Sequence, residues 1–104
     1  MILSSETVYT IDKLNIQKDK QLLLDALNKA KKAIELPDFV DDLFTEEEIL
    51  DLAQRLKIAK LIIAGKTYDE IAEKVSTSTS TVSKIGQILK FGKGGLAKAF
   101  PKPK

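Results

Sequence analysis

The chain has 104 residues, of which 43% are hydrophobic and 31% are charged, a balance typical of one small folded domain. It contains no cysteine and no histidine, which excludes disulfides, thiolate metal sites and the commonest general base. No apolar run reaches the roughly 20 residues that span a bilayer, and the N-terminus lacks the features of a signal peptide. We therefore expect a cytoplasmic protein that is not an enzyme, uses no metal or cofactor and does not bind a membrane.

Charge is unevenly distributed along the chain, although the formal net charge is only +2. Residues 1–64 hold nine basic and twelve acidic side chains, whereas residues 65–104 hold eight basic and three acidic ones. From Ser76 onward there are six lysines and no acidic residue. This asymmetry predicts a polyanionic partner for the C-terminal part of the chain. The alternative is that these lysines serve solubility alone.

The spacing of apolar residues predicts helices nearly throughout, and therefore an all-α fold. Residues 1–15 are expected to form a partly ordered N-terminal extension. The first predicted helix covers residues 16–36, where apolar side chains recur every three or four positions at Leu23, Ala26, Leu27, Ala30 and Ile34. Pro37 suits the first turn of a short second helix, PDFVDDLF, because that position has no hydrogen bond for its missing N–H to lose.

The next predicted helix begins at Thr45. The sequence TEEE is a capping box, in which the Thr45 side chain accepts from the Glu48 N–H and the Glu48 side chain accepts from the Thr45 N–H. The helix is expected to continue to about Ala64, with Gly65 as its left-handed stop. Towards its end it is apolar nearly all round, so it must be buried on more than one side. In so short a chain we expect a second copy to supply the cover, in a homodimer.

A second capping box, from Thr67 to Glu70, predicts a short helix that ends at Val75. Its inward face is expected to carry Ile71, Ala72 and Val75, with Ala72 as the small residue where two helices cross. A later apolar stripe predicts another helix, with inward positions Val82, Ile85, Ile88 and Leu89. Two short helices joined by a turn near residues 76–78 are the frame of a helix-turn-helix. Ser76 departs from the pattern, because glycine is usual at that position of the turn.

The run of hydroxyl residues in STSTSTVSK is then the N-terminus of the second helix, capped by Ser78, rather than a linker. Free N–H groups near the starts of both helices are expected to receive phosphate oxygens. Short polar side chains can meet base edges in the major groove, and lysines add attraction that is independent of sequence. The expected DNA-binding residues are Thr67, Ser78, Thr79, Ser80, Ser83, Lys84, Gln87 and Lys90. The alternative is that serine and threonine merely form a soluble helix start.

The segments FTEEEILDLAQRLKIAKLIIAGKTYDEIAEKV and STVSKIGQILK resemble the Trp repressor superfamily, in particular its bacterial TrpR-like YerC/YecD family. The resemblance covers roughly residues 20–92. It implies an intertwined helical homodimer with a helix-turn-helix at about residues 67–90, inside an all-helical domain of residues 16–92. It also implies binding to double-stranded DNA, at a pseudo-palindromic site whose half-sites lie about one helical turn, roughly 34 Å, apart.

The function that we infer is sequence-specific DNA binding, as a transcriptional regulator. The alternative is a helix-turn-helix module for protein–protein interaction without specific DNA binding. An enzyme is disfavoured because the sequence has no metal-ligand cluster and no glycine loop that could cradle a phosphate.

The resemblance also bears on tryptophan as an effector. Thr45 and Arg55 match the positions that hold the tryptophan carboxylate in the repressor, whereas Lys84, Ile85 and Ile88 replace an arginine, a glycine and a serine of that site. Lysine lacks a flat guanidinium to stack on the indole, and two branched side chains would fill the slot. We therefore expect a vestigial effector site that does not bind tryptophan. A different carboxylate effector at Thr45 and Arg55 stays open.

The last segment, FGKGGLAKAFPKPK, contains three glycines and two prolines, which oppose a long helix. We expect residues 93–104 to form a basic, flexible tail whose lysines follow phosphates. The alternative is that Leu96, Ala97 and Phe100 dock as one short turn.

Overall fold

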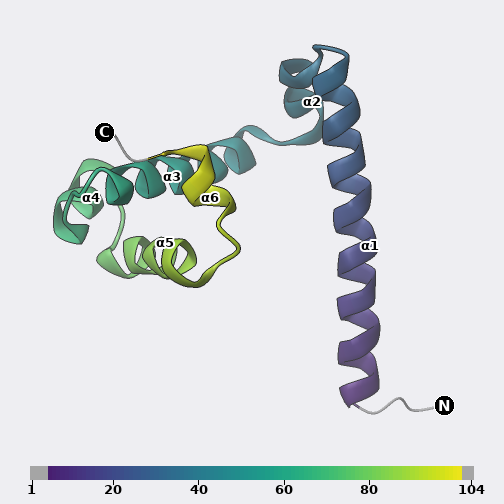
Figure 1. Cartoon of the computed structure of the whole chain (residues 1–104), viewed down its shortest axis with the longest axis horizontal. Helices are drawn as coiled ribbons and strands as arrows, with labels where there is room; N and C mark the ends of the chain where they lie inside the picture. Colours follow the sequence, from purple (N-terminus) through teal and green to yellow (C-terminus); the bar gives the residue numbers. More distant parts are fainter. Residues whose placement is uncertain (1–4, 102–104) are drawn as a thin grey trace. The chain divides into compact units, whose positions relative to one another are not determined.

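The computed structural model describes the backbone of residues 5–101 and the side chains of residues 15–101. Over these residues the chain forms six helices and no strand, which confirms the all-α prediction (Figure 1). The chain divides into two compact units between Phe44 and Thr45. The first contains α1 (Ser5–Lys32) and α2 (Leu36–Leu43); the second contains α3 (Glu46–Ile63), α4 (Tyr68–Lys74), α5 (Thr79–Phe91) and α6 (Gly95–Ala99). Among residues 5–101, no helix combines the length and hydropathy that a membrane span requires.

Helix α1 is longer at its start, and shorter at its end, than the apolar spacing predicts. Residues 5–15, which belong to the predicted N-terminal extension, are already part of this helix. Residues 1–4 lie outside the described part. It ends in a Schellman motif, in which the Glu35 N–H donates to Ala30 O at 2.9 Å and the Ile34 N–H donates to Lys31 O at 3.3 Å. The prediction that Ile34 continues the apolar stripe is therefore wrong. Ile34 adopts the left-handed conformation that the motif requires (φ 60°) and is 90% exposed.

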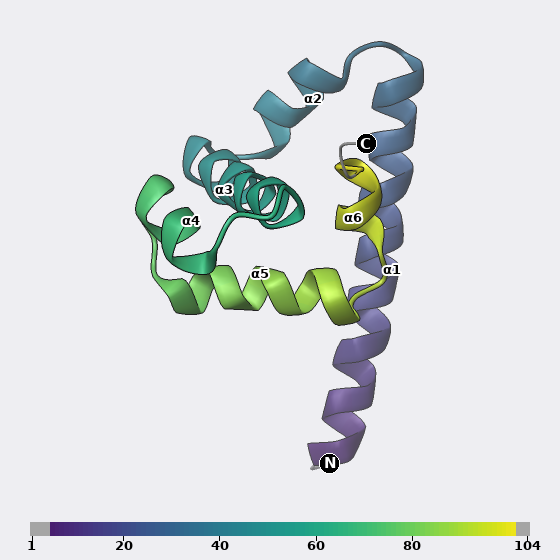
Figure 2. The same cartoon turned by 60° about the vertical axis from the view of Figure 1, so that its left-hand side comes forward.

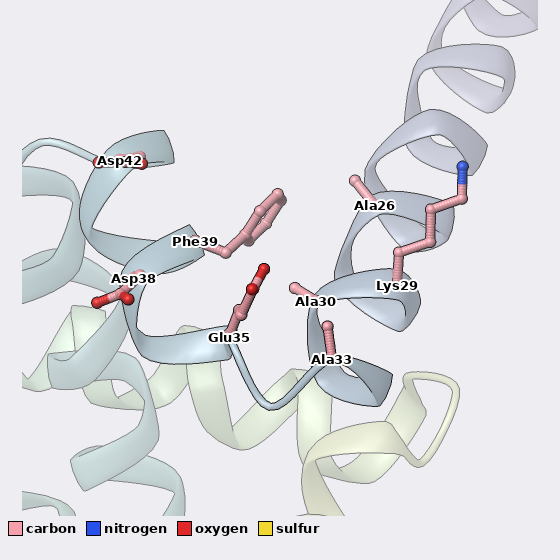
Figure 3. Close-up of a pocket in the computed structure, with 8 residues that line it drawn as sticks. All are labelled: Ala26, Lys29, Ala30, Ala33, Glu35, Asp38, Phe39 and Asp42. Carbon is pink, nitrogen blue, oxygen red and sulfur yellow. The ribbon is translucent and has the colours of Figure 1, made fainter.

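The first unit packs α2 against the last turns of α1. Pro37 lies in the first turn of α2, as predicted. Ala26 and Ala30 form a flat side of α1, and the ring of Phe39 from α2 points towards it (Figure 3). An open groove of about 680 Å³ lies between the two helices. Ala30 is the one buried residue among residues 15–44, so this part of the unit has almost no apolar core of its own.

Both predicted capping boxes are present in the second unit. At the start of α3, the Glu48 N–H donates to Thr45 Oγ1 at 3.1 Å and the Thr45 N–H donates to Glu48 Oε1 at 3.0 Å. The box at the start of α4 repeats this geometry with Thr67 and Glu70, at 3.2 and 3.1 Å. Gly65 follows α3 with φ 91°, which confirms its role as a left-handed stop. Local sequence therefore defines where these helices begin and where α3 ends.

The core of the second unit is formed where α3, α4 and α5 meet. Figure 2 shows α3 nearly end-on, with α5 crossing below it, and both α4 and α5 contact α3. The buried side chains of this cluster are Ile58, Ala59, Ile71, Ala72, Val82 and Ile85. Because all three helices contribute to one core, the position of α5 is determined by the long helix α3 as well as by α4.

Helix α6 turns back from the end of α5 and contacts α3 (Figure 2). Leu96 and Phe100 are half-buried and pack against the core, as expected if this segment docks as a short turn. Ala97, the third residue expected to dock, is exposed. Residues 102–104 of the expected basic tail lie outside the described residues.

Candidate nucleic-acid interface

Helices α4 and α5 form the predicted helix-turn-helix. Ile71 of α4 and Val82 and Ile85 of α5 are fully or almost fully buried in the shared core. Ala72 is buried beside them, and Val75 at the end of α4 is half-buried against the same cluster. These positions confirm the inward face predicted for α4 and, for α5, the predicted inward positions Val82 and Ile85, whereas Ile88 is 49% exposed. The polar sides of both helices are left for contact with a partner.

The turn between the two helices is a second Schellman motif. The Thr77 N–H donates to Ala72 O at 2.9 Å, and the Ser76 N–H donates to Glu73 O at 3.3 Å. Ser76 takes the left-handed conformation, with φ 56°. A residue other than glycine costs about 1–2 kcal/mol there, so the surrounding contacts hold the turn against this strain.

One of these contacts comes from α3. The side-chain amide Nε2 of Gln54 donates to the backbone oxygen of Val75 at 3.4 Å, at a partly buried position. This bond connects the long helix to the first residue of the turn. The sequence does not predict this contact of Gln54, because its partner is 21 residues away and no local pattern marks the pair.

The hydroxyl run is ordered and begins α5. Ser78 caps the helix as predicted, because its Oγ accepts from the Thr81 N–H at 3.2 Å. The same oxygen lies 2.9 Å from Ser80 Oγ and 3.0 Å from Thr81 Oγ1, so three hydroxyls share one network. Thr81 was not among the expected DNA-binding residues. The T-V-S pattern gives no signal that the Thr81 hydroxyl joins this network, because the contact follows from the geometry of the cap.

The residues expected to contact DNA lie on the outside of the two helices. Ser83 is half-buried, and the other seven are exposed: Thr67, Ser78, Thr79, Ser80, Lys84, Gln87 and Lys90. On α5, Ser80, Lys84 and Gln87 follow one another at helical spacing and form one continuous side. The expected residues of α5 therefore lie on one helix, whereas Thr67 lies at the start of α4.

The charges at the helix starts differ. The first turn of α3 carries three acidic residues and that of α4 carries two, but α5 carries none. The amides of Thr67 and Glu70 at the start of α4 are already occupied by the capping box. The start of α5 therefore combines the positive end of a helix dipole with neutral hydroxyls and no carboxylate, which makes it the more favourable of the two for a phosphate.

Gly86 is a further residue that the sequence reasoning missed. It is buried in the middle of α5, where a Cβ would overlap the Tyr68 hydroxyl and lie 3.0 Å from its Cζ. The close crossing of α4 and α5 thus depends on Gly86 as well as on Ala72. The available signal was a glycine inside a helical pattern, which costs about 1 kcal/mol relative to alanine and so suggests a packing reason.

Two sequence comparisons bear on this arrangement. A family model described as Trp repressor protein matches residues 18–103, which is most of the chain. The chain belongs to the Trp repressor family. The chain is also similar to the uncharacterised protein YerC of Bacillus subtilis (strain 168), with 35% identity over 94 residues that cover 90% of this chain and 89% of YerC. No solved structure gives a significant match.

Membership of the Trp repressor family confirms the resemblance and indicates a DNA-binding regulator with a helix-turn-helix. The matched residues include α2 to α6 and therefore the whole of the candidate interface. The fold of the second unit agrees with that family, since its helix-turn-helix follows directly on a long capped helix.

The positions that match the tryptophan site of the Trp repressor family differ from one another in their surroundings. The Thr45 hydroxyl is engaged as the cap of α3, while Arg55 and Lys84 are exposed. Ile85 is part of the core, whereas Ile88 is 49% exposed. The prediction that Ile88 lies in the inward stripe is therefore wrong for the single chain. It lies about a quarter turn from the side of α5 that faces α3 and α4.

Proposed function

We propose that this member of the Trp repressor family is a sequence-specific DNA-binding transcriptional regulator that reads double-stranded DNA with α5. The observation that carries the proposal is the start of α5, where an ordered hydroxyl run faces outward without any acidic residue in the first turn. Hydroxyl and amide groups there suit base edges and phosphates. Lys84 and Lys90 on the same helix add attraction to the phosphate backbone.

The proposed regulator is a homodimer. Both units leave large apolar side chains exposed, which a small soluble chain rarely does without a partner surface. These are Leu22, Leu23, Leu24 and Ile34 in the first unit, and Leu52, Leu56, Ile88 and Phe91 in the second. The first unit also has an open groove between α1 and α2 (Figure 3), and residues 15–44 have almost no core. A second copy that packs on these surfaces would give each unit the burial that it lacks.

The dimer has its own test, by analytical ultracentrifugation over the range of concentrations at which DNA binding is measured. We expect the mass of two chains. A variant with Leu56→Glu should shift the equilibrium towards single chains, because a carboxylate would have to be buried in the interface. A chain that stays monomeric at every concentration at which it binds DNA would contradict the homodimer.

DNA binding is tested by selection of bound sites from random DNA at two salt concentrations. We expect a pseudo-palindromic site with half-sites about 34 Å apart, because a dimer presents two copies of α5 to successive major grooves. Affinity should fall steeply as salt rises. Ser80→Ala and Ser83→Ala should change the preferred sequence at one position in each half-site, while the overall salt dependence stays the same.

The second candidate is a module for protein–protein interaction, which the exposed apolar side chains of α3 favour. It predicts no enrichment of any sequence in the selection and no dependence of DNA binding on the residues of α5. The two candidates are therefore separated by the same experiment.

A further inference from the structure

A groove runs between α3 and the end of α4, and we call it the lysine groove. Its volume is about 800 Å³, within the range of roughly 300–1,000 Å³ that is common for small-molecule sites. Its apolar lining comes from Leu50, Leu61, Ala64 and Val75. Leu50 is 68% exposed, so the groove presents an apolar side chain to solvent.

Three lysines share this groove. Lys57 and Lys60 come from α3 and Lys74 comes from α4, and no acidic side chain is part of the lining. Three lysine side chains that line one groove give it a local positive potential, which favours an anion. The groove therefore combines an apolar surface with a concentrated positive charge.

We propose that the lysine groove binds a small organic anion that has an apolar body and at least two negative charges. The apolar body would cover the leucine and valine side chains, while the charges meet lysines of both helices. A DNA backbone fits this lining less well, because phosphates and sugars offer no apolar body for Leu50 and Val75. In addition, none of the residues expected to contact DNA lines the groove, and neither Thr45 nor Arg55 does.

The lysine groove is connected to the turn of the helix-turn-helix. Gln54 and Val75, which are joined by the 3.4 Å hydrogen bond, both line it, and so does the strained Ser76. A ligand in the groove would therefore touch the residues that hold the turn. The consequence for DNA, which rests on the proposed function, is that bound ligand changes DNA affinity and that DNA changes ligand affinity by the same factor.

The site is tested with 1-naphthyl phosphate, which joins an apolar ring system to a phosphate, by NMR titration of the labelled full chain without DNA. We expect saturable shifts at the amides of residues 50–64 and 74–76. Inorganic phosphate and 1-naphthol, which each carry half of the chemistry, should bind about tenfold or more weakly. Shifts confined to other residues, such as the exposed leucines of α1, would overturn the proposal.

Variants identify the lysines. The double variant Lys57→Gln with Lys74→Gln should lower the affinity for 1-naphthyl phosphate about tenfold, since two exposed charge interactions are lost. Lys98→Gln on α6 removes the same kind of charge outside the groove and should leave the affinity unchanged. Equal binding by the double variant and the wild type would overturn the proposal. So would the absence of probe binding wherever the chain is dimeric, because a second copy would then cover the groove.

The link to DNA is a separate measurement. DNA affinity is compared with and without saturating 1-naphthyl phosphate, in the wild type and in the double lysine variant. We expect a change in the wild type alone. Probe binding without any such change would remove the link to the turn and leave the site in place. A chain that binds no specific DNA would refute the proposed function, while the NMR titration still decides whether the groove binds the anion.

Discussion

Gly86 of α5 lies directly against the phenol of Tyr68 in α4, and this contact determines how closely the two helices of the interface cross. A Cβ at Gly86 would overlap Tyr68 Oη and stand 3.0 Å from Cζ. Glycine at the centre of a helix is about 1 kcal/mol less favourable than alanine. Glycine at this position therefore lowers helix stability but leaves room for the Tyr68 ring. The orientation of the polar side of α5 depends on this contact.

We predict that Gly86→Ala lowers the free energy of unfolding by about 1 kcal/mol, because overpacking, typically about 1–3 kcal/mol, exceeds the gain in helix propensity. Urea denaturation measures the difference. In a Tyr68→Phe background the loss should be smaller, since the hydroxyl that the new methyl group meets is absent. The same loss in both backgrounds would show that the two residues do not interact.

Ser76→Gly should stabilise the protein by about 1 kcal/mol, because glycine adopts the left-handed conformation without the strain that serine carries. The matched control is Gly65→Ala at the end of α3, where φ is 91° and no atom lies within 4 Å of the added Cβ. That change introduces backbone strain alone and should destabilise by a similar amount. If Ser76→Gly left the midpoint of urea denaturation unchanged, the turn would not be strained in solution.

The cap of α5 can be separated from its role in DNA binding. Ser78→Ala should destabilise the protein by about 1 kcal/mol, because the Thr81 N–H loses its acceptor. Ser78→Asp should restore the stability, since aspartate is an equally good cap, yet weaken DNA binding because it places a carboxylate where a phosphate is expected. DNA affinity of Ser78→Asp equal to that of the wild type would place the phosphates elsewhere.

Lys84→Ala should weaken binding to every DNA sequence and flatten the slope of log affinity against log salt by about one, because one phosphate contact is lost. Lys31→Ala on α1 is the matched control, since it removes the same charge from an exposed residue outside both the expected DNA-binding set and the lysine groove. Fluorescence anisotropy at several salt concentrations measures both slopes. An unchanged slope for Lys84→Ala would remove that residue from the interface.

L-tryptophan should leave the melting temperature unchanged at millimolar concentration. A ligand that binds only the folded chain must raise the melting temperature, and here Ile85 is packed in the core while Thr45 already serves as a helix cap. Differential scanning calorimetry with and without the amino acid gives the answer. A clear increase would mean that the vestigial site still functions.

The features that the sequence by itself determined are those whose partners lie within one turn of helix. Thr45 with Glu48, Thr67 with Glu70, and Ser78 with the Thr81 N–H each cap a helix through residues three positions apart. Such a bond forms together with the helix and does not depend on the conformation of the rest of the chain. For this reason the sequence alone assigns the hydroxyl run to the start of a helix, α5.

Only the tertiary structure decided the features that depend on how the helices pack. The Gln54–Val75 bond joins residues 21 apart, and the lysine groove exists because α3 and α4 place Lys57 and Lys74 on one surface. Apolar spacing likewise could not show that Ile88 lies outside the packed side of α5. Periodicity gives the direction in which the apolar side of a helix faces, but not how much of that side its neighbours bury. Distant contacts depend on the folded arrangement of whole helices, and no short pattern in the sequence encodes that arrangement.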